Sequence, residues 1–169
     1  MNLAAIASFL ERQLGSMLTA AFIYGSVAAD RAGPYSDIDC FVITARDLSP
    51  EQRHLLGNEF ATLQCSLGYV PDPDYPIELF SVGACVAALE SEPLHRALAG
   101  AAGGQLDPSV ATSDEVEVLG ALLDRRMVIR PSPVLDELTA RARSVLERHA
   151  EHQASLMAIL GLAHDRTGS

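Results

Sequence analysis

The chain has 169 residues, of which 49% are apolar, and a formal net charge of -10. This length allows one domain with a hydrophobic core but not two full domains, and no apolar run is as long as a membrane span. All twelve cationic side chains are arginines, too few to neutralise the phosphates of a nucleic-acid polymer from an acidic surface. We therefore expect a globular protein with neither a membrane nor a nucleic-acid polymer as its partner.

The N-terminal residues predict an amphipathic helix. Asn2 can cap it, Gly15 can end it, and apolar residues recur between them at helical spacing. The segment lacks the basic leader of a signal peptide, so we expect a cytoplasmic protein. In that reducing compartment the three cysteines, Cys40, Cys65 and Cys85, are expected to be free and buried thiols.

Two short β-prone runs enclose a polar loop. The first run ends at the pair Gly25 and Ser26, and the second covers residues 40–44, directly after Asp37 and Asp39. Residues two apart on a strand point the same way, so a strand that included both aspartates would carry their carboxylates on one face. We therefore predict a charged turn between two core strands, with paired carboxylates on the second.

Downstream of residue 44 the pattern alternates between helices and strands. Ser49 to Gln52 form a capping box with proline at the first helical position. We predict helices over residues 50–68, 83–90, 93–99 and 114–124 and after residue 133, strands over 75–82 and 127–130, and a loop up to residue 104. This order predicts an α/β (α+β) fold, a mixed sheet flanked by helices, with a core domain over residues 1–130 and a C-terminal helical extension over 131–169.

The polar loop favours divalent-metal and phosphate chemistry. Asp37 and Asp39 offer two oxygen ligands of the kind that Mg²⁺ binds in proteins. Glu78 is a lone carboxylate in an apolar strand, where a shared metal would stabilise its charge. Gly25 and Ser26 bring backbone N–H groups and a hydroxyl, which suit phosphate oxygens. Together these residues predict a site for metal-assisted attack on phosphorus.

A Gly-Ser pair, ten further residues, an Asp-x-Asp and a later carboxylate together resemble the nucleotidyltransferase superfamily typified by DNA polymerase β. The pattern is similar to that of small bacterial minimal nucleotidyltransferases and aminoglycoside adenylyltransferases. The resemblance implies a nucleoside triphosphate with two Mg²⁺ ions and transfer of a nucleoside monophosphate to a hydroxyl, with release of pyrophosphate. It also implies that Gly25 and Ser26 hold the phosphates, and that Asp37, Asp39 and Glu78 are catalytic metal ligands.

Two departures from the family pattern leave three functions open. Ala29-Asp30 stands where many minimal members have Arg-Gly, with Arg31 as the nearest replacement cation. After Arg130 the chain continues for about forty residues, where the antibiotic-modifying relatives have a large helical domain. The chain could use ATP to modify a hydroxyl of a small molecule or a protein. It could instead be an antitoxin-type enzyme that adenylylates a partner toxin, or an inactive regulatory or scaffold module of the same fold.

Each candidate also has a simpler interpretation. The whole segment could be a surface turn, and Glu78 could be an edge-strand residue that faces water. Ser36 is a further candidate nucleotide contact, but a turn serine that bonds its own backbone is the more common case. Tyr24 and Tyr35 could stack on a base, although aromatic residues beside a strand usually belong to the core.

The C-terminal helix carries an apolar seam in steps of three and four, interrupted by two histidines. Its positions are Leu135, Leu138, Ala142, Val145, His149, His152, Leu156, Ile159 and Ala163. The seam could cover its own domain, or it could form a homodimer or partner interface that weakens as the histidines protonate below about pH 6.5. A metal site at His149, His152 and His164 is less favoured, because no cysteine or carboxylate completes it at ligand spacing.

Overall fold

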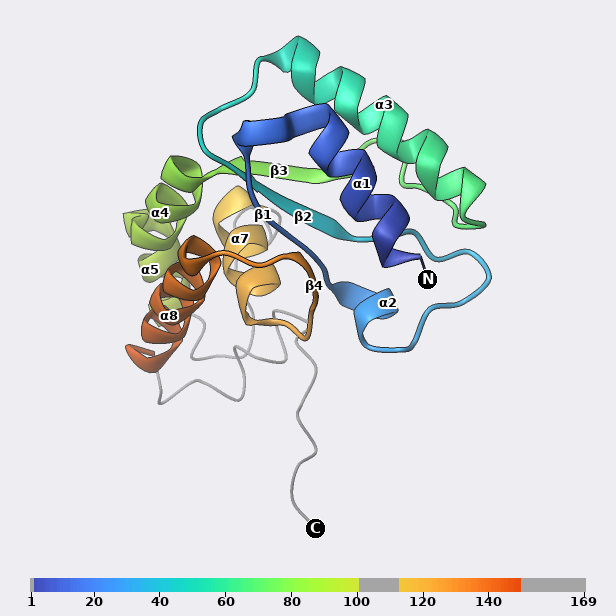
Figure 1. Ribbon diagram of the computed structural model, residues 1–169. Helices are drawn as coiled ribbons and strands as arrows, with labels where there is room; N and C mark the ends of the chain where they lie inside the picture. Colours follow the sequence, from blue (N-terminus) through green and yellow to red (C-terminus); the bar gives the residue numbers. More distant parts are fainter. Residues whose placement is uncertain (1, 101–112, 150–169) are drawn as a thin grey trace. The chain divides into compact units, whose positions relative to one another are not determined.

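The computed structural model describes residues 2–100 and 113–149 (Figure 1). The chain divides into two compact units: Met1–Ala84 with Arg126–Leu135, and Cys85–Arg125 with Asp136–Ser169. The boundary at residue 130 that the sequence predicts stays a prediction.

The first unit contains a four-stranded mixed sheet. Its strands are β1 (Leu18–Ile23), β2 (Cys40–Thr44), β3 (Glu78–Ser81) and β4 (Met127–Arg130), in the spatial order β3-β2-β1-β4. β1 is antiparallel to both β2 and β4, whereas β2 and β3 are parallel and are connected through a helix. The predicted mixed sheet with flanking helices is confirmed, although β3 is shorter than the predicted strand over 75–82.

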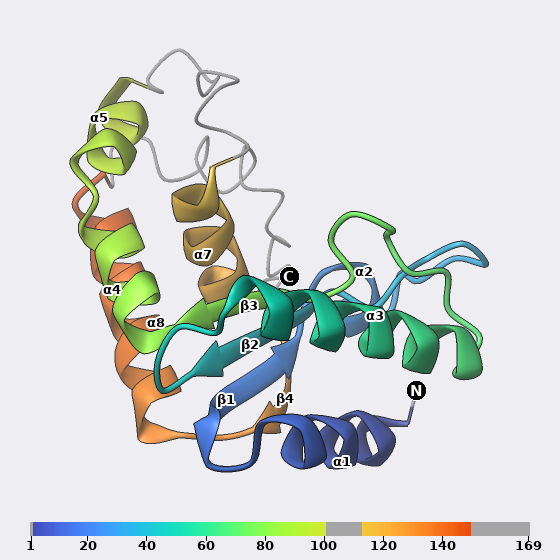
Figure 2. The same cartoon turned by 90° about the horizontal axis from the view of Figure 1, so that it is seen from above.

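Two helices cover one face of this sheet, as Figures 1 and 2 show. The first is α1 (Leu3–Leu14), capped by the Asn2 side chain and ended by Gly15, which leads into a short 3₁₀ helix, η1 (Gly15–Met17). The second is α3 (Pro50–Ser66), which begins with the predicted capping box. The core beneath them is formed by buried apolar residues of α1, α3 and the sheet, among them Ile6, Phe9, Leu10, Ala21, Ile23, Cys40, Val42, Leu56, Phe60 and Leu79.

A row of aromatic rings crosses β1, β2 and β3 on the face of the sheet opposite to the one that α1 and α3 cover. The rings of Phe22, Phe41 and Phe80 are stacked with 5.2 Å between neighbouring centroids. Tyr24 packs edge-on against Phe22 and Phe41, and the Arg126 guanidinium lies 5.5 Å from the Phe22 centroid. Tyr24 is therefore half-buried and packs on two buried phenylalanines.

The second unit is helical in its described part. It contains most of α4 (Val82–Glu90), α5 (Glu92–Gly100), α7 (Asp114–Leu123) and most of α8 (Pro133–Glu147). All four helices were predicted close to these bounds, whereas the end of the loop predicted up to residue 104 lies outside the described residues. None of the helices in the described part of the chain is long and apolar enough to cross a membrane.

The four apolar positions of the C-terminal seam that the structure describes are buried. Leu135, Leu138, Ala142 and Val145 are at most 2% exposed, so these positions pack within this chain. His149 follows the end of α8, and its Nε2 lies 3.4 Å from Nδ1 of His95. His152, His164 and the rest of the seam lie outside the described residues.

The three cysteines are free thiols with unequal exposure. Cys40 and Cys85 are buried, but Cys65 is exposed on α3, so the prediction that all three are buried was wrong for Cys65. The prediction failed because α3 packs only one of its faces against the sheet, and residue 65 lies on another. Burial raises the pKa of Cys85 to about 12.

We expect one thiol per folded chain to react rapidly with Ellman's reagent at pH 8, and three in denaturant. The thiolate is the reactive form, and the raised pKa of the Cys85 thiol keeps it protonated at that pH, while Cys40 is fully buried. The Cys65→Ser variant should lose the fast phase. Rapid reaction of two thiols in the folded protein would contradict the burial of the other two.

Candidate functional site

The C-terminal end of β1 and the N-terminal ends of β2 and β3 lie side by side. We call this border of the sheet, where strands begin and end, the site edge. β1 runs antiparallel to β2, so the last residue of β1, Ile23, pairs with the first residue of β2, Cys40. β2 and β3 are parallel, and Phe41 pairs with Glu78 at the start of β3. The residues that follow β1 and those that precede β2 and β3 therefore all lie at the site edge. The sequence-predicted candidates come from these segments.

Asp37 and Asp39 precede β2 and do not lie on it, which corrects the predicted placement of both carboxylates on a strand. The Tyr24 N–H still donates to the Asp39 carbonyl oxygen at 3.1 Å, one step beyond the β1–β2 ladder. The Ile38 N–H instead donates to a side chain, Oε1 of Gln64, at 2.7 Å. This bond takes the aspartate segment out of the regular ladder. Ile38 is nevertheless buried between two half-buried aspartates, so the alternation was predicted correctly.

The Asp39 carboxylate lies directly against Gly25. A Cβ atom at residue 25 would stand 2.1 Å from Oδ2 of Asp39, and Gly25 has a φ of +65°. Only glycine combines this left-handed backbone with such a close approach. Gly25 and Ser26 open a four-residue helix, α2 (Gly25–Ala28), where the sequence predicted an open turn.

The segment after α2 folds back on the Gly-Ser pair. The Ala29 N–H donates to the Gly25 carbonyl at 3.1 Å, and the Arg31 N–H donates to the Ser26 carbonyl at 2.8 Å. Asp30 has a φ of 56°, which aspartate tolerates better than most residues. The exposed Arg31 thus lies next to Ser26 along this turn, while Ala29 and Asp30 form the bend itself.

Ser36 is a turn residue, as the simpler interpretation predicted. Its Oγ accepts a hydrogen bond from the Gly33 N–H at 2.8 Å, and its own N–H donates to the Gly33 carbonyl at 3.2 Å. The neighbouring Tyr35 is 85% exposed, so the expectation that it belongs to the core was wrong.

Glu78 begins the edge strand β3, and one of its carboxylate oxygens, Oε2, is buried. The interpretation that this side chain simply faces water therefore does not hold for Oε2. The pKa of the Cys40 thiol lies well above its ordinary value, first because of burial and then because of the negative charges of Glu78 and Asp39. Asp39 and Glu78 thus act electrostatically on the same thiol.

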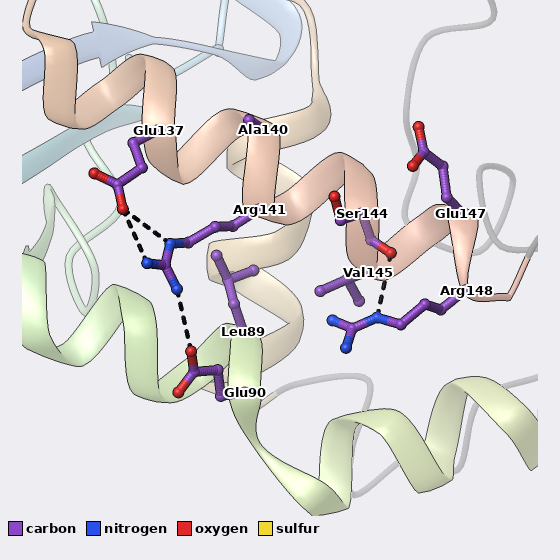
Figure 3. Close-up of a pocket in the computed structure, with 9 residues that line it drawn as sticks. All are labelled: Leu89, Glu90, Glu137, Ala140, Arg141, Ser144, Val145, Glu147 and Arg148. Carbon is purple, nitrogen blue, oxygen red and sulfur yellow. Dashed lines mark hydrogen bonds and ion pairs between the residues drawn. The ribbon is translucent and has the colours of Figure 1, made fainter.

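Two other observations limit where a ligand could bind. Within residues 2–100 and 113–149, no group of three or more His, Cys, Asp or Glu side chains forms a metal-binding cluster. A hollow of about 700 Å³ in the second unit is lined by α4 and α8, where Arg141 pairs with Glu90 at 3.1 Å and with Glu137 at 2.9 Å (Figure 3). None of its lining residues belongs to the catalytic, metal or nucleotide-binding set predicted from the sequence.

Comparisons with known proteins agree on the fold. A model of the nucleotidyltransferase domain matches residues 3–70, which include the Gly-Ser pair and both aspartates. A chain from a crystal structure of a mutant of the toxin–antitoxin MntA-HpeT is similar over 95% of this chain and 97% of its own, with 13% identity and a TM-score of 0.50. A chain from a toxin–antitoxin crystal structure with AMP-PNP is similar over the same shares, with 16% identity and a TM-score of 0.50.

No protein with a curated function matches this sequence significantly. The matched domain covers α1, β1, the polar loop, β2 and α3, the elements that bring Gly25 and Asp39 together. The chain therefore carries a nucleotidyltransferase domain over residues 3–70 and has the nucleotidyltransferase fold.

Proposed function

We propose that the protein transfers AMP from ATP to a hydroxyl of a partner protein, as an antitoxin acting on a toxin. The observation that carries the proposal is the contact between the Asp39 carboxylate and Gly25 at the edge where β1 ends and β2 begins. This contact places a carboxylate, a side chain suited to a metal ion, beside a Gly-Ser turn, whose backbone N–H groups suit phosphate. A protein acceptor is supported by the similarity to chains from toxin–antitoxin structures, one of which was solved with AMP-PNP.

Carboxylate oxygens are among the ligands that Mg²⁺ prefers in proteins. Asp37, Asp39 and Glu78 would hold it, and its charge would stabilise the buried carboxylate oxygen Oε2 of Glu78. Mg²⁺ is commonly bound by one or two carboxylates together with substrate phosphates and water, so a closed protein cage is not required. When bound, Mg²⁺ would neutralise phosphate charge and favour attack at the α-phosphorus.

The residues of the chain would divide the remaining work. The acceptor oxygen attacks the α-phosphorus, the bond to the β-phosphate oxygen breaks, and pyrophosphate leaves with the electron pair. Asp39 would take the proton of the acceptor hydroxyl, and Gly25 and Ser26 would hold the phosphates. Arg31 would supply a cation in place of the missing Arg-Gly. The Ser36 hydroxyl accepts from Gly33 and still has a proton to donate to the nucleotide.

The proposal is tested by incubating the protein with each α-labelled nucleoside triphosphate and Mg²⁺. The acceptors are proteins that co-purify with the chain from its own host, and separately an aminoglycoside panel. We expect label from ATP on a protein, with an equal amount of pyrophosphate released. Label only on a small molecule would keep the reaction but overturn the protein acceptor. Mg²⁺-dependent ATP binding without any pyrophosphate release would favour the inactive module.

A further inference from the structure

Gln64 links the two segments that carry the candidate carboxylates. Its side chain is on α3 and is fully buried. Oε1 accepts a hydrogen bond from the Ile38 N–H at 2.7 Å, and Nε2 donates to the Pro76 carbonyl at 2.9 Å. Ile38 lies between the two aspartates, and Pro76 lies two residues before Glu78. One amide group thus joins the segment before β2 to the segment before β3.

The two partners require an amide at this position. A backbone N–H can only donate and a backbone carbonyl can only accept, so Gln64 must present its oxygen to Ile38 and its nitrogen to Pro76. A buried amide with both ends bonded is held in one orientation, because turning it would leave buried polar groups unsatisfied. The backbone around it is tied down as well: the Tyr69 N–H donates to the Gln64 carbonyl at 3.0 Å, and the Val70 N–H donates to the Ser36 carbonyl at 3.1 Å.

The β2–β3 ladder does not itself connect the aspartate segment to the segment before Glu78. The β2–β3 pairing begins with Phe41 opposite Glu78, and both aspartates come before Phe41 in the chain. Asp39 is held to β1 through the Tyr24 N–H, but that bond does not involve β3. The Gln64 amide connects the aspartate segment directly to the segment leading into β3.

We propose that Gln64 is a positioning residue that sets the separation between the aspartate pair and Glu78 for binding of the metal–nucleotide complex. This inference rests on the proposed function. Gln64 acts only through the backbones of Ile38 and Pro76. Its role is comparable to that of an outer-shell residue at a metal site, whose loss weakens metal affinity or activity by about 10- to 100-fold.

The test compares wild-type protein with Gln64→Met, which keeps the length of the side chain and removes both hydrogen bonds. Binding of Mn²⁺ in the presence of AMP-PNP is measured by electron paramagnetic resonance, without any need for turnover. We expect the apparent Kd for Mn²⁺ to rise by about 10- to 100-fold. Hydrogen exchange at the Ile38 amide, followed by NMR, should accelerate in the same variant.

The matched control is Phe60→Leu, one turn earlier on α3. Phe60 is buried against Phe9, so this change weakens the same helix without touching either loop. It should leave Mn²⁺ affinity within about twofold of wild type. Gln64→Leu is a second variant: it is also apolar and removes both hydrogen bonds, so its Kd should also rise.

The outcomes separate the two claims. Absence of Mn²⁺ and AMP-PNP binding by the wild type would overturn the proposed function, and this inference with it. Binding by the wild type with the same Kd in Gln64→Met as in Phe60→Leu would overturn only the role of Gln64. Unchanged exchange at the Ile38 amide in Gln64→Met, or wild-type affinity in Gln64→Leu, would contradict the two-bond link.

Discussion

Replacing Asp39 with asparagine is expected to lower nucleotidyl transfer on the order of 10³-fold while the fold persists. The amide keeps the size of the side chain, so its contact with Gly25 remains sterically acceptable. It loses the negative charge that would hold Mg²⁺, and metal stabilisation of the transition state is worth several kcal/mol. The rate is measured as pyrophosphate release from ATP in the presence of the acceptor protein that takes up the label.

The control for this change is Asp47→Asn, which makes the same substitution at an exposed loop residue after β2. It should keep the rate of the wild type within about twofold, because Asp47 follows the opposite end of β2 and the effect of an exposed charge is screened by solvent and salt. Circular dichroism and thermal midpoints should match for both variants. A wild-type rate in Asp39→Asn would remove this carboxylate from the proposed metal site.

Replacing Gly25 with alanine is expected to lower transfer nearly as much as the loss of the Asp39 charge. The new methyl group would stand 2.1 Å from Oδ2 of Asp39, so the carboxylate must leave its position. The backbone φ of +65° adds strain of about 1–2 kcal/mol for a residue with a Cβ atom. We expect a lower free energy of unfolding, measured in urea, together with the loss of transfer.

Two other glycines separate these effects. At Gly68 a Cβ atom would meet nothing within 4 Å, but φ is +85°, so Gly68→Ala reports the strain alone. Gly33 has open space and no such backbone conformation, so Gly33→Ala should be close to neutral. In an Asp39→Ala background, Gly25→Ala should cost only the strain. Equal destabilisation by Gly25→Ala in both backgrounds would show that the contact with Asp39 is not what excludes a side chain.

The parts of the fold that could be predicted are those encoded by neighbouring residues. Asn2 caps α1, and Ser49 and Gln52 cap α3, through hydrogen bonds that span three residues. Such bonds need only neighbouring residues, so the start of each helix can be predicted from the local sequence. The turn at Ser36 could be predicted for the same reason, because its hydrogen bond to Gly33 also spans three residues. The pattern of Gly-Ser and Asp-x-Asp indicated the nucleotidyltransferase domain that residues 3–70 match.

The errors in the prediction concern one contact between distant residues and the burial of two side chains. The aspartates were expected on a strand, but the Ile38 N–H bonds to Gln64, 26 residues later in the chain. Tyr35 was expected in the core and is exposed, and Cys65 was expected to be buried and is also exposed. Composition gives an average preference for burial, whereas the packing of each helix and loop decides the individual side chain.

The sequence by itself determined the chemical types and their order: a Gly-Ser pair, two carboxylates after it and a third further on. Only the tertiary structure decided that the Asp39 carboxylate rests on Gly25, and that one buried amide ties the aspartates to the segment before Glu78. The physical reason is the range of the interactions. Caps and turns are completed within a few residues, whereas the edge of the sheet forms only when β1, β2 and β3 pair and α3 packs across them.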